Sequence, residues 1–209
     1  LGPARLLFHL NPATWGARRF DAPRGVRIRQ ALEDLGPIFV KFGQSLSTRQ
    51  DLLAPDIGQE LAKLQDEVPP FPAEQALAEV ERSFGSPAET VFASFDRESL
   101  AAASIAQVHA ARLHSGEDVV VKVLRPRVRQ LIQQDLEVMY TVARLAWRWW
   151  PEARRLRPVE VVREYEKTIL NELDLLREAA NATQLRRNWQ GSPLIYVPKV
   201  YFDYCRTGV

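Results

Sequence analysis

A short β-branched run that leads into a lysine constrains the fold of this chain more than any other feature. The three valines at 119–121 stand directly before Lys122, and Val123 and Leu124 follow it. β-Branched residues favour strands, and an apolar run of this length fits a buried strand. A lysine in such a strand must find an anion to remain charged. We therefore predict a strand at 119–124 and an acidic partner for Lys122.

A second strand-like run precedes this strand and indicates a hairpin. It covers Ile105–Leu113, and the polar residues His114–Glu117 lie between the two runs. A short polar segment with a glycine between two apolar runs is typical of a β-turn. Residues 195–197 and 200–202 are also strand-like. Because these runs build only part of a sheet, we expect the isolated chain to be poorly stable.

Much of the remaining sequence carries helical periodicity. Ile28, Leu32 and Leu35 recur at helical spacing, and Gly36-Pro37 is a signal that ends one helix and begins another. Further helices are predicted at 57–65, 73–84, 127–150 and 158–188. The fold class expected is therefore α+β, with a small antiparallel sheet and long helices.

The proline-rich residues 69–72 mark a change in organisation. A run of this kind is typical of a stiff linker between domains. We predict a helical N-terminal extension at 1–72 and a second domain at 73–209.

Composition excludes several classes of protein. Hydrophobic residues make up 46% and charged residues 26%, which is the balance of an ordered globular protein. The net charge of +2 is too small to indicate a nucleic-acid binder. The single cysteine, Cys205, cannot form an internal disulfide, so a reducing compartment is expected. No zinc-like spacing joins His9, His109 and His114, and we predict no metal site within this chain.

Three acidic residues lie on the helix predicted at 158–188. Asp174 and Glu178 would be about 40° apart around its axis and so share a face, whereas Glu172 would lie about 160° from Asp174. One straight helix cannot direct all three carboxylates at a single ligand. We therefore expect either two separate roles or a distorted turn within the helix.

The order of these elements is that of the N-terminal lobe of a kinase. In kinases a strand lysine contacts the nucleotide phosphates, and a glutamate on the following helix holds it in place. Lys122 is the candidate lysine. A glycine-rich loop normally covers the phosphates, but alanine excludes the positive-φ conformations that glycine allows. The residues at the matching positions are Ala101, Ala102, Ala103 and Ser104.

Lys41, Gly43 and Gln44 form a further constellation on the helix that begins at Pro37. Lys41 and Gln44 are three residues apart and so project from one face of the helix. Gly43 costs the helix about 1 kcal/mol relative to alanine, which suggests the close approach of another segment.

Taken together, these residues resemble the UbiB family, also called the ADCK group of atypical kinases, and especially its bacterial ubiquinone-biosynthesis members. Four family motifs occur in order along the chain. They are a KxGQ motif at 41–44, the alanine-rich segment at 101–104 with its continuation to His109, the strand lysine Lys122, and an ExD motif at 172–174. The resemblance covers the chain from about Leu32 to its end.

The resemblance implies a nucleotide site. In the family's pattern Lys122 binds the phosphates and Glu178 pairs with it, while the alanine-rich segment covers the nucleotide and disfavours ordinary protein-kinase activity. The fold implied is a kinase-like N-terminal lobe with a helical KxGQ extension. The cofactors implied are ATP and Mg²⁺.

The ExD and KxGQ motifs have implied roles as well. Lys41 and Gln44 would lie on a helix over the place where a protein substrate would dock, and Glu172 and Asp174 would meet that helix near the active site.

The sequence departs from the family's pattern after Asn181. No His-x-Asp catalytic loop and no metal-binding Asp-x-Gly follow, and the Asp-x-Gly at 56–58 precedes the lysine and reads as a turn. We therefore expect the chain to be the front part of a longer protein, with the Mg²⁺ ligands outside it. Alone it should show weak or no ATP hydrolysis.

At the level of function, the resemblance implies an ATPase that supports ubiquinone (coenzyme Q) synthesis at the cytoplasmic face of the bacterial inner membrane. Implied partners are a quinone precursor or other lipid-like ligand, other ubiquinone-biosynthesis proteins and a membrane surface, but no nucleic acid. The alternative from another class is a non-catalytic module that binds lipid or quinone, or acts as a scaffold.

Two features bear on membrane contact. Trp147, Trp149 and Trp150 stand beside Arg144 and Arg148, and tryptophan and arginine are residues of bilayer surfaces. Such a cluster can equally cap a helix bundle. The arginine-rich first 30 residues likewise fit either anionic lipid or a solvated basic face. No run of about 18 apolar residues suits a membrane span.

Overall fold

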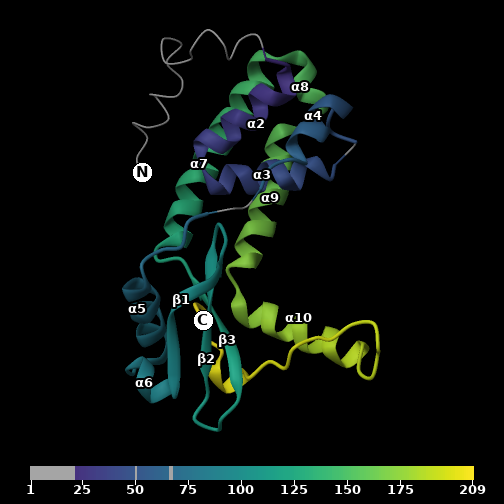
Figure 1. Cartoon of the computed structure of the whole chain (residues 1–209). Helices are drawn as coiled ribbons and strands as arrows, with labels where there is room; N and C mark the ends of the chain where they lie inside the picture. The colour runs from purple at the N-terminus through teal and green to yellow at the C-terminus, as the bar shows by residue number, and fades with distance from the viewer. Residues whose placement is uncertain (1–21, 50, 66–67) are drawn as a thin grey trace. The chain divides into compact units, whose positions relative to one another are not determined.

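The computed structural model describes residues 22–49, 51–65 and 68–209, which form two compact units, 1–67 and 68–209 (Figure 1). The proline-rich residues 69–72 belong to the second unit, whereas the sequence placed them at the end of the first. Much of the arginine-rich start, and His9 with it, lies outside the described residues.

Unit 1 is helical in its described part. Its helices are α2 (Arg24–Leu35), α3 (Pro37–Ser47) and α4 (Pro55–Leu61). The boundary predicted at Gly36-Pro37 is confirmed: Gly36 has φ 115°, which only glycine adopts readily, and Pro37 begins α3. The Asp-x-Gly at 56–58 lies within α4, so its interpretation as a turn was wrong. Pro55 begins this helix two residues earlier than predicted.

Unit 2 combines a small sheet with helices. Its helices are α5 (Ala73–Phe84), α6 (Ala88–Val91), α7 (Val128–Trp149), α8 (Pro151–Arg155), α9 (Pro158–Glu172), α10 (Leu175–Asn188) and the short 3-10 helix η3 (Phe202–Tyr204). α5 has the predicted bounds, and Gly85 ends it in the left-handed conformation at φ 70°. Figure 1 shows α7 and α9 side by side.

The sheet has three antiparallel strands in the order β1-β2-β3. They are β1 (Ser94–Ala102), β2 (Ala106–Arg112) and β3 (Asp118–Leu124). The predicted hairpin of β2 and β3 is confirmed, and the α+β fold class with it. One face of the sheet packs with α5, α6 and the end of the chain around a core that includes Val80, Phe92 and Val123.

Two predicted elements are wrong. The helix expected at 158–188 is divided at Leu173 and Asp174, and α10 turns away from the line of α9 (Figure 1). The strand-like residues 195–197 and 200–201 adopt no regular structure, and Phe202 begins η3. A strand needs a hydrogen-bonding partner, and this segment does not pair with the sheet.

Candidate functional site

The alternation of side chains along β3 sets the position of Lys122. Val121 and Val123 are buried in the core on one face of the sheet. Successive residues of a strand point to opposite faces, so Lys122 and Val120 project from the other face. There Val120 is 65% exposed. The strand thus carries its lysine on an open face while its valines hold the sheet to the core.

Lys122 is paired with Glu178 of α10. The Lys122 ammonium Nζ donates to both carboxylate oxygens, 2.8 Å from Oε1 and 2.7 Å from Oε2. The two side chains are 37% and 53% exposed. Ion pairs this open to solvent contribute little to stability, typically below about 1 kcal/mol. The pair joins β3 to α10, a helix that follows it later in the chain, and so provides the strand lysine and helix glutamate of the kinase pattern.

The alanine-rich segment lies in register with the lysine. Ala101 pairs with Val108 across β1 and β2, and Val108 pairs with Lys122 across β2 and β3. Residues directly opposite in an antiparallel pair share a face, so these three residues form one row across the sheet. With strands about 4.8 Å apart, Ala101 and Lys122 lie about 10 Å from each other.

The rest of that segment closes the β1–β2 hairpin. Ala102 is the last residue of β1, and the Ala103 N–H donates to the Ala106 carbonyl at 2.8 Å. Ser104 and Ile105 form the tip and are buried. A strand end and a tight turn therefore replace the loop that the sequence analysis expected here.

The ExD motif occupies the break between α9 and α10. Glu172 is the last residue of α9, and Asp174 caps α10 by accepting from the Arg177 N–H at 3.0 Å. Leu173 and Leu175 on either side of Asp174 are both buried. In a continuous helix these two leucines would point about 160° apart, so the break lets both reach the interior.

This break corrects the geometry predicted for the three acids. Asp174 precedes α10 and does not share a helical face with Glu178 through a continuous helix. The distorted turn, one of the two alternatives, is what the structure contains. The carboxylate of Asp174 thus has a partner of its own in the Arg177 N–H, whereas that of Glu178 pairs with Lys122.

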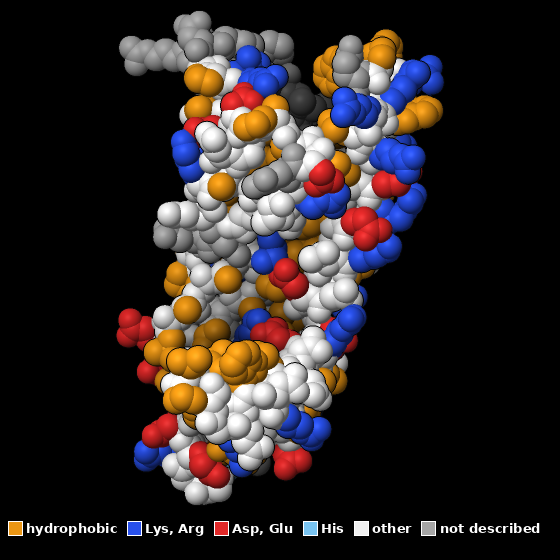
Figure 2. All heavy atoms as spheres, turned by 90° about the vertical axis from the view of Figure 1, so that its right-hand side faces the viewer, with side chains coloured by type: hydrophobic (Ala, Val, Ile, Leu, Met, Phe, Trp, Pro, Cys, Tyr) orange, Lys and Arg blue, Asp and Glu red, His pale blue; other side chains and the backbone are white. Residues whose placement is uncertain are grey.

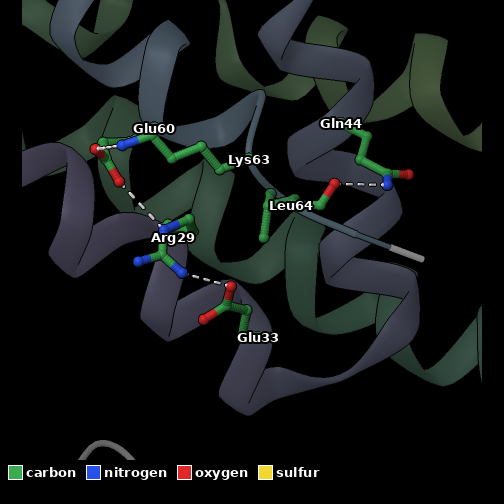
Figure 3. A network of polar contacts seen from close by, with 6 residues as sticks. All are labelled: Arg29, Glu33, Gln44, Glu60, Lys63 and Leu64. Carbon is green, nitrogen blue, oxygen red and sulfur yellow. Dashed lines mark hydrogen bonds and ion pairs between the residues drawn. The ribbon is translucent and has the colours of Figure 1, made fainter. Parts of the chain in front are cut away.

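The KxGQ motif has a clear packing role within unit 1. A Cβ on Gly43 would overlap Leu64 Cδ1 and lie 2.7 Å from Leu32 Cδ1. The close approach predicted at this glycine is therefore confirmed. Gln44 donates through Nε2 to the Leu64 carbonyl at 3.1 Å (Figure 3), and Lys41 is half-buried on the same helix.

Ion pairs reinforce the same unit. Arg29 of α2 donates to Glu33 at 2.7 Å and to Glu60 of α4 at 3.2 Å, and Glu60 also pairs with Lys63 (Figure 3). The Lys63 and Arg29 side chains lower the pKa of Glu60 by hydrogen bonding to its carboxylate. These contacts fix α4 against α2 and so hold the segment that Gln44 binds.

A separate hollow of about 440 Å³ lies where α10 ends. Its lining includes Thr183, Arg186, Trp189, Ile195 and Tyr196. Figure 2, which faces the side where α10 projects, shows apolar side chains gathered over this end. None of the sequence-predicted site residues lines this hollow.

The tryptophan cluster lies at the junction of α7 and α8. Trp147, Trp149 and Trp150 are 53%, 71% and 64% exposed. The Arg154 guanidinium lies 5.3 Å from the Trp147 ring centroid, and its Nε donates to the Trp147 carbonyl at 3.0 Å. Burial in a helix bundle therefore does not account for these tryptophans.

Among the described residues, no helix is both long and apolar enough to cross a membrane. Within the same ranges, no three His, Cys, Asp or Glu side chains gather in a way that could hold a metal ion.

A match to a protein-family model agrees with the kinase-like order of the strand lysine, Lys122, and the helix glutamate, Glu178. Residues 63–209 match the model of the ABC1 atypical kinase-like domain. The chain belongs to the ABC1 atypical kinase-like family. The resemblance predicted from the four motifs is thereby confirmed.

The relatives of this chain include bacterial proteins named "Probable protein kinase UbiB". Over 206 residues, this chain is 62% identical to the protein of Pseudomonas paraeruginosa. The matched residues cover 98% of the chain and 39% of that protein. This chain is 59% identical over 206 residues to that of Azotobacter vinelandii, covering 98% of the chain and 38% of that protein. The chain thus spans well under half the length of the curated relatives it matches.

A solved structure supports the fold of this ABC1 chain. It is the complex of Rv3197 with erythromycin from Mycobacterium tuberculosis, with a TM-score of 0.53 and 27% sequence identity. The match covers 82% of this chain and 45% of the other.

Two side chains near the alanine-rich segment were not among the predicted site residues. Gln107 and Arg125 bind backbone groups of residues 69–71, and Arg125 also binds the carbonyl of Ala103. The place of Gln107 in the continuation of the alanine-rich motif to His109 was the sequence signal that could have pointed to it.

Proposed function

We propose that this chain supplies the nucleotide-binding part of an atypical kinase-like ATPase that is required for, or regulates, ubiquinone biosynthesis. The observation that carries the proposal is the bidentate pair of Lys122 and Glu178 on an open face of the sheet. Membership of the ABC1 family and similarity to proteins named UbiB support the same function.

Each side chain of the pair has a distinct part in this proposal. The Lys122 ammonium binds phosphate oxygens of ATP as a compact positive charge. Glu178 holds that ammonium in place between β3 and α10, so that binding loses less side-chain entropy. The open face beside Ala101 and Val108 is apolar and can accept the rest of the nucleotide.

The alanine-rich segment, Ala101–Ser104, covers the nucleotide from the hairpin end in this proposal. Its side chains keep the backbone away from the phosphates more than glycines would. We attribute to this difference a preference for ATP hydrolysis over ordinary phosphate transfer to proteins.

The other two motifs complete the proposed site in the full-length protein. Glu172 and Asp174 face the reacting groups, and the helix of Lys41 and Gln44 restricts access of protein substrates. Mg²⁺ bound with ATP would neutralise phosphate charge during transfer. Its ligands belong to residues outside this chain, and the isolated 209 residues should hydrolyse little or no ATP.

The test is the quinone profile of cells whose own copy is deleted and replaced by the full-length gene. Three versions are compared: wild type, Lys122→Ala and Lys167→Ala. Lys167 is an exposed lysine paired with Glu164 at 2.7 Å on α9, so its loss controls for removal of a surface charge pair.

Ubiquinone restored by wild type and Lys167→Ala but not by Lys122→Ala would support the proposal. Restoration by all three would assign the protein a scaffold or lipid-binding role instead. Restoration by none would remove the ubiquinone assignment and leave the kinase-like fold.

A second candidate function is binding to an anionic membrane surface, favoured by the exposed tryptophans at the α7–α8 junction. Five exposed arginines lie close to them in the sequence: Arg144, Arg148, Arg154, Arg155 and Arg157. Indole rings seat at the headgroup level of bilayers, and each basic residue near anionic lipid adds about 1 kcal/mol. Such a surface would bring the protein to lipid-like quinone precursors at the inner membrane.

Vesicle flotation tests this second function. The protein should float with vesicles that contain anionic lipid, and a variant with Trp149 and Trp150 changed to serine should not. Equal flotation with neutral and anionic vesicles, or no flotation at all, would rule it out.

A further inference from the structure

Residues 68–72, here called the proline segment, are bound to the sheet through one side-chain amide. Pro69, Pro70 and Pro72 have no N–H, so Phe71 carries the only backbone donor among residues 69–72. That N–H donates to Gln107 Oε1 at 3.0 Å, and Gln107 Nε2 donates to the Phe71 carbonyl at 3.4 Å. The amide thus satisfies both backbone groups of Phe71, as a neighbouring strand would.

A buried histidine fixes the orientation of that amide. His109 Nδ1 lies 2.8 Å from the Asp96 carbonyl, which can only accept, so Nδ1 carries the hydrogen. His109 Nε2 therefore accepts from Gln107 Nε2, at 2.8 Å. Gln107 and His109 are 1% and 0% exposed. The buried chain from Asp96 to Phe71 has one consistent arrangement of donors and acceptors.

Arg125 joins the proline segment to the alanine-rich segment. Its Nη2 donates to the Pro69 carbonyl and its Nε to the Ala103 carbonyl, each at 2.8 Å. The guanidinium carbon also lies 5.3 Å from the centroid of the Phe71 ring. A planar guanidinium holds two acceptors in fixed directions, which a lysine ammonium on a flexible stem does not.

Arg125 is the first residue after β3, which ends at Leu124. It follows Lys122 by three residues, and its own N–H donates to the Ile105 carbonyl at 2.8 Å. Arg125 therefore contacts both the turn of the β1–β2 hairpin and the proline segment, which follows unit 1 and its KxGQ motif in the chain. A movement of the Ala103 carbonyl must change the geometry of the bond to Pro69, because one rigid group makes both.

We propose that Arg125 is a positioning residue that couples nucleotide binding at the alanine-rich segment to the order of the proline segment. The inference rests on the proposed nucleotide site. Nucleotide at Ala101–Ser104 fixes the Ala103 carbonyl, Arg125 then holds the Pro69 carbonyl, and Phe71 stays bound to Gln107. Unit 1, which carries the KxGQ motif and precedes this segment in the chain, is thereby tethered by a segment whose order depends on nucleotide.

Hydrogen exchange of the full-length protein, with and without MgADP, tests the coupling. Peptides spanning 68–72 report the Phe71 N–H almost alone, and peptides spanning 101–106 report the turn. In the wild type we expect MgADP to slow exchange in both, by about fivefold or more at Phe71. In Arg125→Gln we expect protection of the turn to remain and that of Phe71 to be lost. The control Arg112→Gln removes a pair with Asp118 at the far end of β2 and should behave as wild type.

The coupling would be overturned if MgADP still protected the Phe71 N–H in Arg125→Gln. It would also be overturned if only the turn responded to MgADP in the wild type. In both cases the proposed nucleotide site would stand. A wild type in which neither peptide responds would overturn the nucleotide site and this inference together. If Arg125→Gln does not fold, Arg125→Lys decides in the same way. It keeps the charge and reaches one carbonyl, so it should retain protection of the turn and lose most of that at Phe71.

Discussion

Lys122 and Glu178 are 56 residues apart in sequence, yet the ammonium of one lies within 2.8 Å of both carboxylate oxygens of the other. Neither side chain is buried, so the pair is not needed to satisfy a desolvated charge. Its geometry is costly in side-chain entropy and returns little stability. A requirement for a fixed positive charge on the open face of the sheet explains the Lys122–Glu178 pair better than a contribution to stability does.

The first prediction separates stability from binding at this pair. Lys122→Ala and Glu178→Gln should each change the free energy of unfolding by less than about 1 kcal/mol, because the pair is half-exposed. Nucleotide affinity of the full-length protein should fall about tenfold or more with Lys122→Ala, since charge-assisted bonds contribute about 1.5–3 kcal/mol. Urea unfolding and equilibrium binding of MgADP measure the two quantities.

Lys167→Ala is the matched control for that pair of measurements, and it should leave both unchanged. Wild-type affinity in Lys122→Ala would show that the lysine does not bind nucleotide. A stability loss of several kcal/mol would instead assign the pair to the fold.

The second prediction concerns Gly43 and Gly58, which lie inside helices α3 and α4 in the described part of unit 1. Gly43→Ala places a methyl within 2.7 Å of Leu64 and Leu32 side chains, so we expect a destabilisation of about 1–3 kcal/mol despite alanine's helix propensity. Gly58→Ala meets no atom within 4 Å and should stabilise the unit by up to about 1 kcal/mol. Urea unfolding of both variants gives the comparison, and a stabilising Gly43→Ala would show that the leucines move aside freely.

The elements predicted correctly are those whose signals are local. The hairpin follows from β-branched residues on either side of His114–Glu117, and the α2–α3 boundary follows from the conformation that only Gly36 supplies readily. The close approach at Gly43 was likewise visible as a glycine within a helical pattern. In each case neighbouring residues along the chain determine the outcome.

The elements predicted wrongly depend on residues distant in sequence. No proline or glycine marks the break at Asp174; it arises because Leu173 and Leu175 must both be buried and Asp174 can cap α10. β1 has little strand propensity and forms through its pairing with β2. The segment at 195–201 has that propensity and no partner strand.

Of the candidate site, the sequence identified Lys122 and its acidic partner through the family's order of motifs. It did not reveal Arg125 or Gln107, because their ligands are backbone carbonyls and an amide of residues 69–71 and Ala103. Periodicity carries no information on which distant backbone groups a side chain will bind. The roles assigned to the KxGQ and ExD residues in the reaction remain predictions.

The third prediction tests whether Asp174 does more than cap α10. Asp174→Ala should cost about 1 kcal/mol, the usual value of an N-cap, because the Arg177 N–H loses its acceptor. Asp174→Ser keeps an acceptor and should recover that stability. If the carboxylate also serves the active site, the serine variant will still fail to restore ubiquinone in deletion cells. Full restoration by Asp174→Ser would confine the residue to capping.

The fourth prediction is a pH dependence. Asp135 lies on α7 at the edge of the stripe formed by Ile132 and Met139, and burial raises the pKa of its carboxyl to about 6. Because the folded pKa lies above the ordinary value of 3.8, the contribution of this group is favourable below about pH 4 and is lost as pH rises to 6. Asp135→Asn should therefore be more stable than wild type at pH 7.5, by about 1 kcal/mol after allowance for partial exposure.

Asp118 provides a control of opposite sign for Asp135→Asn. Arg112 lowers the pKa of Asp118 by hydrogen bonding to its carboxylate, so its favourable contribution exists above the ordinary pKa and disappears as pH falls below it. Asp118→Asn should therefore be slightly less stable than wild type at pH 7.5, and the difference should vanish in acid. Urea unfolding of wild type and both variants at pH 2.5, 4.5 and 7.5 checks the two signs. The advantage of Asp135→Asn should grow between pH 4.5 and 7.5, whereas the deficit of Asp118→Asn should close only below the ordinary pKa of 3.8. An Asp135→Asn variant whose advantage does not grow with pH would show that this carboxyl titrates normally in the folded protein.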